Sequence, residues 1–491
     1  MASDPRRAAS AVNRFGLGAR PGDLPQMADP TGWLLAQTGR PPAGGALFYG
    51  LPGSLDYLRL EAAVRAEVRA LRRQGGAMTP APGAPAPGAH GKPANPLARI
   101  YVKAFGGDLR REAAARWQVA ATTDTPFCER LVRFWSNHFA VSVDKGPARL
   151  YAAPMEREAI RPHVNGRFVD MLIAVEEHPA MLRYLDQAQS IGPDSAFALR
   201  ADRRLAVRAD GKPARTLGLN ENLAREIMEL HTLGVNGGYS QNDVVEFARA
   251  LTGWSMPWPM QVARGIDADR TFVFREAAHE PGTRTVLGRR YPQDGVQQAR
   301  AILTDLALQP ATARHLAAEL ARHFVADRPP PALVERLARA YLEADGALPA
   351  LYAALIHSPE AWSADAVKFR TPQDFVIAGL RAGGIAIGDR PQPWESFLQR
   401  LGQPTFMPRA PSGFTDVAGD WIAPDALWKR LQVAEALAER VPRAGLDPRA
   451  LARAVLGPGL SLETDRALAR AEAPQQAAAI LFASPEFQWR A

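Results

Sequence analysis

Helix-start signals recur along most of this chain and restrict its fold more than any other feature of the sequence. A residue that can cap a helix precedes a proline at Thr125-Pro126, His178-Pro179 and Thr371-Pro372, and proline is favoured in the first turn of a helix. Ser240, with Asp243 three residues later, resembles a capping box. Apolar residues follow these starts at helical spacing. The sequence therefore predicts a mainly α protein with a large, bundle-like body of many helices.

The middle of the chain carries further structural signals. Asn220 can cap a helix that runs to Leu233, and Gly234 then supplies a left-handed stop. The polar stretch 194–216 separates two helical blocks and is expected to be a surface loop. Thr271–Phe274 and Thr285–Leu287 are β-prone runs with Pro281-Gly282 between them. We expect these two runs to pair as a small β-hairpin insertion.

One low-complexity segment suggests how the chain is divided. Residues 75–96 contain six prolines, five glycines and six alanines, a composition that cannot form a buried core. We therefore predict an N-terminal helical segment at 1–74, a linker at 75–96 and a main helical domain at 97–491. A further boundary inside the main domain is expected near 255–295.

Charge and composition exclude several classes of protein. The chain of 491 residues has a formal charge of +8, but its six lysines and 53 arginines are scattered, whereas nucleic-acid binders gather charge into a stripe or tail. Cys128 is the single cysteine, so an internal disulfide and a multi-cysteine metal site are impossible. No run of 18 apolar residues and no signal peptide occur. We expect no nucleic-acid partner, no membrane span and a cytoplasmic location, although a mature exported chain would look the same.

The common catalytic motifs are absent. The sequence has no GxxxxGK[ST] phosphate loop, no GxSxG nucleophile elbow and no HExxH zinc helix. Any active site must therefore be built from residues that lie apart in the sequence.

The segment 220–233 holds the strongest polar cluster. Glu226 and Glu229 lie three residues apart, so both carboxylates project from one side of a helix. They can bind a divalent metal or act as an acid and base. The structural alternative is an ion-pair ladder through Glu221, Arg225 and Glu229. His231 lies on the apolar face of the same helix, where a histidine is more often part of the core.

The candidate site residues form two sets. The candidate catalytic residues are His138, Glu226, Glu229 and His231. The candidate substrate-binding residues are Trp135, His178, Asp186, Arg225, Tyr239 and Trp254. The Trp- and Met-rich stretch 254–260 can line a hydrophobic groove, or it can be a loop fixed on the core. His315, Glu319 and Arg322 share one helix face, which we interpret as a solvated stripe.

The segment LGLNENLAREIMELHTLGVNGGYSQNDVVEFARALTGW at 217–254 resembles the hallmark of a bacterial family, domain of unknown function 1800. Further matching pieces occur in order, including RFWSNHFAVS at 133–142, EEHPAMLRYLD at 176–186 and KFRTPQDFV at 368–376. The resemblance implies no settled activity. It implies a co-encoded protein related to sulfatases and alkaline phosphatases as a partner. Because many members carry export signals, it also makes the periplasm an alternative location.

Two hypotheses from different classes remain. In the first, the chain is a hydrolase or an oxidoreductase with a site lined by His and Glu, with a divalent metal as the candidate cofactor. In the second, it is a non-catalytic scaffold for the sulfatase- or phosphatase-like partner. The crowding of polar residues into one helix favours the enzyme, because burying charges is costly unless they are paired or used.

Overall fold

The computed structural model describes residues 4–74, 96–146, 148–206, 218–363, 368–388 and 391–490. These residues form 23 α-helices and three two-stranded antiparallel sheets, so the mainly α fold with a small hairpin is confirmed. No helix in these ranges is both long enough and apolar enough to cross a bilayer. Nearly all of the predicted linker lies outside the described residues.

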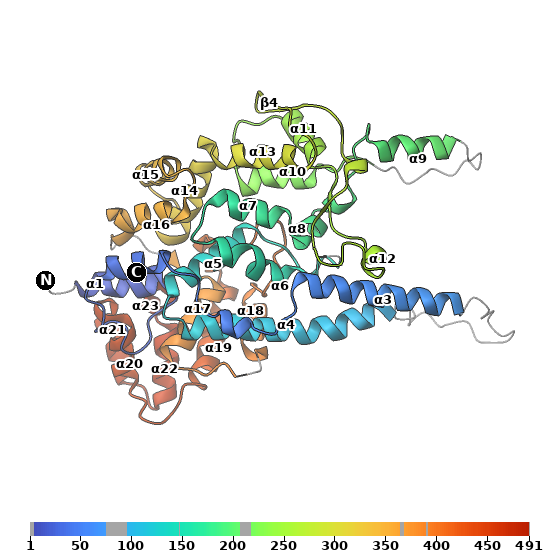
Figure 1. The fold of residues 1–491 in the computed structure, drawn as a ribbon. Helices are drawn as coiled ribbons and strands as arrows, with labels where there is room; N and C mark the ends of the chain where they lie inside the picture. The colour runs from blue at the N-terminus through green and yellow to red at the C-terminus, as the bar shows by residue number, and fades with distance from the viewer. Residues whose placement is uncertain are drawn as a thin grey trace.

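The N-terminal part of the chain includes helix α5, near the centre of the view in Figure 1. Its helices are α1 (Pro5–Ser10), α2 (Pro30–Thr38), α3 (Ser54–Gln74), α4 (Pro96–Thr122), α5 (Pro126–His138), α6 (Ala152–Met155), α7 (Phe168–Glu176), α8 (Pro179–Tyr184) and α9 (Ala196–Ala206). The long helices α3 and α4 pack against each other and project from the body. Helix α9 lies inside 194–216, so the prediction of a loop there is wrong for these eleven residues.

The middle of the chain supplies the helices above α5 in Figure 1. They are α10 (Asn222–Glu226), α11 (Gln241–Leu251), α13 (Val296–Ala307), α14 (Pro310–Phe324), α15 (Pro331–Glu343) and α16 (Leu348–His357). The short helix α12 (Pro259–Val262) of the same part lies instead against α3. Helix α10 continues into a π-helical turn at Ile227–His231. The predicted capping box of α11 is present, with Ser240 and Asp243 bonded reciprocally.

The C-terminal part packs mainly as its own group of helices, with α19 against α22. They are α17 (Pro372–Ala382), α18 (Gln392–Leu401), α19 (Pro424–Ala438), α20 (Pro448–Leu456), α21 (Leu462–Ala469), α22 (Pro474–Ala483) and α23 (Pro485–Gln488). Thr371 caps α17, as predicted, by accepting from the Asp374 N–H. Thr125 does not cap α5, because its hydroxyl bonds to the Thr123 hydroxyl instead.

The strands pair differently from the prediction. β1 (Trp254–Ser255) pairs with β2 (Val273–Phe274), and β3 (Arg284–Val286) pairs with β4 (Arg289–Tyr291). The two predicted runs are therefore strands of different sheets and do not pair with each other. The turn that closes the β3–β4 hairpin consists of Leu287 and Gly288, both with positive φ, as a tight two-residue hairpin turn requires. The third sheet joins β5 (Lys368–Phe369) to β6 (Trp489–Arg490).

One hydrophobic core runs from Ala8 to Phe487. Phe15, from the N-terminal segment, packs on Phe127 of α5, Phe324 of α14 and Trp362. Aromatic contacts of this kind bury large apolar area. The described residues of 1–74 thus belong to the same hydrophobic core as the main body. The domain boundaries stay predictions.

Candidate metal centre

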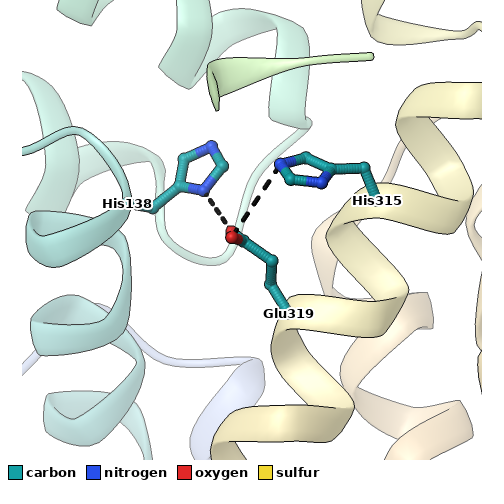
Figure 2. A group of neighbouring side chains, drawn as sticks. All are labelled: His138, His315 and Glu319. Carbon is teal, nitrogen blue, oxygen red and sulfur yellow. Dashed lines mark hydrogen bonds and ion pairs between the residues drawn. The ribbon is translucent and has the colours of Figure 1, made fainter. Parts of the chain in front are cut away.

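Three polar side chains from two helices converge beside the core (Figure 2). His138 is the last residue of α5, and His315 and Glu319 lie one turn apart on α14. His138 Nδ1 lies 2.7 Å from Glu319 Oε2, and His315 Nε2 lies 3.9 Å from Glu319 Oε1. One candidate ligand atom from each residue lies within 4.8 Å of the others. Two imidazoles and one carboxylate are a recurring ligand set for catalytic metals.

The packing of α5 and α14 fixes these positions. Leu316 and Leu320 of α14 are fully buried, so the adjacent face with His315 and Glu319 is turned toward α5. One turn before His138, Trp135 donates its indole N–H to the Tyr352 hydroxyl at 2.6 Å, and that hydroxyl donates to the Val164 carbonyl. This buried chain of hydrogen bonds holds the end of α5 in place.

The π-helical turn at 227–231 supplies the second layer of contacts. His138 Nε2 lies 3.2 Å from the His231 carbonyl oxygen, and His315 Nε2 lies 3.0 Å from the Leu230 carbonyl oxygen. Carbonyls in the last turn of a helix have no partner within the helix, so they can accept from side chains. Metal-binding histidines characteristically donate their second ring N–H to a carbonyl or carboxylate, and His138 has this arrangement.

His138 lies between two hydrogen-bond acceptors. Its Nε2 faces the His231 carbonyl and its Nδ1 faces the Glu319 carboxylate. A neutral imidazole carries only one N–H, which cannot satisfy both contacts. The two contacts can be hydrogen bonds at the same time only if a second proton is present, whereas a cation bound to Nδ1 would leave the single N–H on Nε2 for the His231 carbonyl.

Gly234 lets His315 approach the end of the π-helical turn. Its φ is +83°, and a Cβ at this position would lie 2.8 Å from His315 Nδ1. Glycine adopts positive φ without strain. Gly234 is left-handed as predicted, but the helical segment ends at His231 and not at Leu233. The same glycine also makes room for His315.

Two groups of the cluster have shifted pKa values. Burial lowers the pKa of His315 and the charge of His138 adds to this, although the charge of Glu319 opposes it; the ring is therefore neutral at pH 7. Burial alone would raise the pKa of Glu319, but the hydrogen bond and charge of His138 outweigh it and hold this pKa below the usual range. Near neutral pH the cluster therefore offers an ionised carboxylate beside a neutral imidazole.

A cavity of about 290 Å³ lies next to the cluster and is lined by His138 and Glu319. Most other charged groups of its wall are paired, for example Arg116 with Glu156 at 2.7 Å and Arg130 with Asp374 at 3.0 Å. Arg322, one turn beyond Glu319, makes no hydrogen bond or ion pair with any residue that the structure describes. The cavity thus presents one uncommitted cation beside the His/Glu cluster.

His323 and Asp416 form a second dyad in the wall of this cavity. His323 Nδ1 lies 2.7 Å from Asp416 Oδ2, while its Nε2 has no hydrogen-bond partner. Burial lowers the pKa of His323. The interaction with His323, helped by Lys368 and Arg490, outweighs the burial of Asp416 and holds the pKa of this carboxyl group at about 2. The imidazole is therefore neutral, and its Nε2 lone pair can accept a proton.

His231 forms a separate, sealed pair. Its Nδ1 lies 2.7 Å from Glu176 Oε1, and the two side chains are 1% and 0% exposed. The structure brings His231 close to His138, with ring centres 6.1 Å apart. The backbone carbonyl of His231 bonds to the candidate ligand His138. The imidazole of His231 bonds to Glu176 instead.

Glu226 and Glu229 lie outside the cluster, on partly exposed positions of the same segment. Burial and the charge of Glu229 raise the pKa of Glu226, while the charge of His231 opposes this shift. Tyr239 lies near both carboxylates, which with burial raise its pKa. Arg225 bonds to Glu221 and Gln241, each at 3.0 Å, and within the described chain no contact joins it to Glu229. The predicted ladder therefore stops at Arg225.

The remaining predicted residues have structural contacts elsewhere. His178 caps α8 through Nδ1, and its Nε2 lies 2.9 Å from Glu158. Asp186 binds Lys145 at 2.6 Å. Trp254 is fully buried and packs edge-on against Phe272.

The interpretation of His315, Glu319 and Arg322 as a solvated stripe is wrong. The side chains of His315 and Glu319 are only 20% and 29% exposed, because the end of α5 and the 227–231 turn cover that face of α14. A usable signal was present in the sequence, since the spacing His-x₃-Glu places both groups on one helix face.

Comparison with known proteins finds a match to one family model and no match to an individual protein. A family model described as protein of unknown function (DUF1800) matches residues 10–489, which confirms the resemblance found in the sequence. No curated protein and no solved structure matches the chain.

Proposed function

Because the chain belongs to the DUF1800 family, whose function is unknown, we propose a function from its own residues. We infer that it is a metal-dependent hydrolase of an anionic substrate, with the ion held by His138, His315 and Glu319. The convergence of these three ligand groups at the edge of a cavity carries the proposal.

The residues fit a metal ion in two respects. Tetrahedral bonds of about 2.1 Å separate ligand atoms by roughly 3.4 Å, and the two contacts to Glu319, at 2.7 and 3.9 Å, lie on either side of that value. To bind the ion through Nε2, His315 would have to give up the hydrogen bond that this nitrogen donates to the Leu230 carbonyl. A cation beside His138 Nδ1 would also resolve the conflict between its two acceptors. His138 Nε2–H would then donate to the His231 carbonyl, as an outer-shell contact does.

The cavity favours hydrolysis among the reactions open to this ligand set. A metal bound by two histidines and a carboxylate supplies activated water at neutral pH. Arg322 is placed to bind an anionic group of the substrate, and a guanidinium suits carboxylates and phosphates. His323, one turn beyond Glu319 on α14 and held by Asp416, can take up a proton.

Metal titration tests the ligand set directly. The full chain, stripped with a chelator, is titrated with Zn²⁺, Mn²⁺ and Fe²⁺ by calorimetry. Replacement of Glu319→Gln or His315→Asn is expected to weaken binding by more than the roughly 10- to 100-fold that loss of an outer-shell partner costs. The matched control is Glu158→Gln, which alters the His178–Glu158 pair and should leave binding unchanged. Equal binding by all variants would remove the proposed site.

Hydrolysis is tested with nitrophenyl phosphate, nitrophenyl sulfate and neutral nitrophenyl acetate on the metal-loaded chain. The anionic esters are expected to be cleaved in preference to the neutral one. Arg322→Gln should raise KM for the anions with little change for the acetate, because only the anions use the guanidinium. Turnover of no ester by a chain that binds metal stoichiometrically would contradict the hydrolase and favour an oxidoreductase.

A second candidate function is docking to the co-encoded sulfatase- or phosphatase-like protein. It is favoured by an apolar patch on α19, where Leu427, Trp428 and Leu431 are 41%, 61% and 48% exposed. Clustered exposed apolar side chains mark interaction surfaces. Co-purification with that protein should succeed for the natural chain and fail for Trp428→Arg. Equal recovery with both would show that this patch is not the interface.

A further inference from the structure

A second cavity lies between α8, α9 and the segment after β1. Its volume is about 480 Å³, and it shares no lining residue with the cavity beside the metal candidates. Sites for small organic ligands commonly measure about 300–1,000 Å³. The position agrees with the hydrophobic groove predicted from the Trp- and Met-rich stretch 254–260.

The walls of this cavity are mostly apolar. They include Leu182, Ile191, Phe197, Met256, Pro257 and Trp258. Trp258 is 51% exposed and Phe197 is 40% exposed, although large aromatic side chains gain most when they are buried. An apolar body placed in the cavity would cover both rings.

Arginines dominate the charge of the same walls. Arg65, Arg183 and Arg275 line the cavity together with one carboxylate, Asp186. That carboxylate is paired with Lys145 at 2.6 Å. The first two arginines both bind Glu61 at 2.8 Å. Arginines therefore outnumber carboxylates among the residues that line the cavity.

Arg275 differs from the other two arginines because no carboxylate of the described residues forms an ion pair with it. Its guanidinium lies 4.5 Å from the centre of the Trp258 ring, and its Nη2 donates to the Met256 carbonyl at 2.7 Å. Burial lowers its pKa to about 10, so it stays charged at neutral pH. The aromatic ring and the carbonyl fix the orientation of the guanidinium, which leaves other N–H groups for a ligand.

We propose that this cavity binds an amphipathic carboxylate, with its apolar body against Trp258, Met256 and Phe197 and its head group on Arg275. The proposal is independent of the metal centre, because the two cavities have no residue in common. It commits to one class of ligand, a small apolar molecule with a single anionic head.

The test uses three probes with the same ten-carbon chain and different head groups. Decanoate, decanol and decylamine are each titrated into the full chain below their critical micelle concentrations, with calorimetry and tryptophan fluorescence as readouts. Decanoate is expected to bind about 10- to 100-fold more tightly than decanol, the range for a hydrogen bond to a charged group. Decylamine should bind more weakly than either. Equal affinities for all three probes, or no binding of decanoate, would overturn the proposal.

Variants assign the binding to this cavity. Arg275→Gln should reduce the affinity for decanoate to that for decanol, and Arg275→Lys should retain part of the difference. Arg264→Gln is the matched control, because Arg264 is exposed on the same segment and does not line the cavity. Ala277 is an exposed residue that lines the cavity. Ala277→Trp should fill the cavity and block decanoate and decanol alike, without placing a new side chain in the hydrophobic core. Unchanged decanoate binding in Arg275→Gln or in Ala277→Trp would place the ligand elsewhere.

Discussion

Two histidine–glutamate pairs with the same contact distance stand next to each other in this protein. His231–Glu176 and His138–Glu319 both have a nitrogen–oxygen distance of 2.7 Å, and the two imidazole centres are 6.1 Å apart. The first pair is sealed, with no more than 1% of either side chain exposed, whereas Glu319 of the second is 29% exposed and lines a cavity. We refer to them as the sealed pair and the open pair. Two pairs with equal contact distances thus differ in their access to solvent, since of the two only the open pair lines a cavity.

The largest loss in the free energy of unfolding is expected from breaking the sealed pair. Glu176→Ala leaves the His231 imidazole buried without its partner, and loss of one member of a buried pair costs about 3–5 kcal/mol. The free energy of unfolding, measured by denaturant titration, should fall by that amount. The matched control is Glu177→Ala, whose partner Arg300 lies near the surface and which should cost no more than about 1 kcal/mol. Similar losses for both variants would remove the distinction between sealed and open pairs.

The next largest effect is expected at Gly234, beside the open pair. Gly234→Ala places a β-carbon in the left-handed region and against His315, and the backbone strain alone costs about 1–3 kcal/mol. Gly238→Ala is the matched control, because its φ of +86° is similar and no atom lies within 4 Å of the added carbon. Both variants should lose stability in thermal unfolding, but only Gly234→Ala should also weaken metal binding. Normal metal affinity in that variant would show that His315 can move aside freely.

A change in pH is expected to have an intermediate effect on the free energy of unfolding, because His315 takes up a proton. Because its folded pKa is lowered, the unfolded chain binds the proton first as the pH falls below about 6.5. This histidine therefore contributes stability above pH 6.5 that is lost on acidification, with a slope of at most about 1.4 kcal/mol per pH unit. Between pH 7.5 and 5, unfolding of His315→Asn should depend less steeply on pH than that of the natural chain. Identical slopes would contradict the assignment.

Glu319 makes stability depend on pH in a lower range of pH than His315 does. Its pKa is held below the usual value, so its contribution to stability is present above about pH 4.5 and is lost as the pH falls through the folded pKa. The unfolding free energy should therefore lose this contribution only at pH values below those at which His315 acts.

The smallest change in stability is expected from breaking the open pair itself. Glu319→Gln keeps the size of the side chain and removes a charge that water partly screens, so the cost in the metal-free protein should be about 1 kcal/mol or less. Chemical denaturation of the chelator-treated protein measures it. A loss as large as that of Glu176→Ala would mean that the open pair is also a structural one.

Local signals in the sequence predict the helices well because capping is a short-range interaction. The Ser240–Asp243 box and the Thr371 cap depend on atoms three residues apart, and both are present. The strand pairing was missed because β1 and β2 join segments that lie nearly twenty residues apart. No local pattern selects between such partners.

The candidate site was only partly predictable for a related reason. His138 was recognised, but the charged face of α14 has the same periodicity whether water or another helix covers it. The contacts that distinguish the two cases come from α5 and from the π-helical turn, more than 80 residues away along the chain. Tertiary packing therefore decides whether the Glu319 carboxylate faces water or the ring of His138.

The π-helical turn at Ile227–His231 has a consequence for how this sequence can change. A π-turn is one residue wider than the α-helical turn that it replaces. Deletion of Met228 would regularise the helix and remove the wide turn in which the Leu230 and His231 carbonyls face His315 and His138. The local helix would become more regular, while both histidines lost their anchors at once. Substitutions within this turn are therefore easier to accommodate than any change in its length.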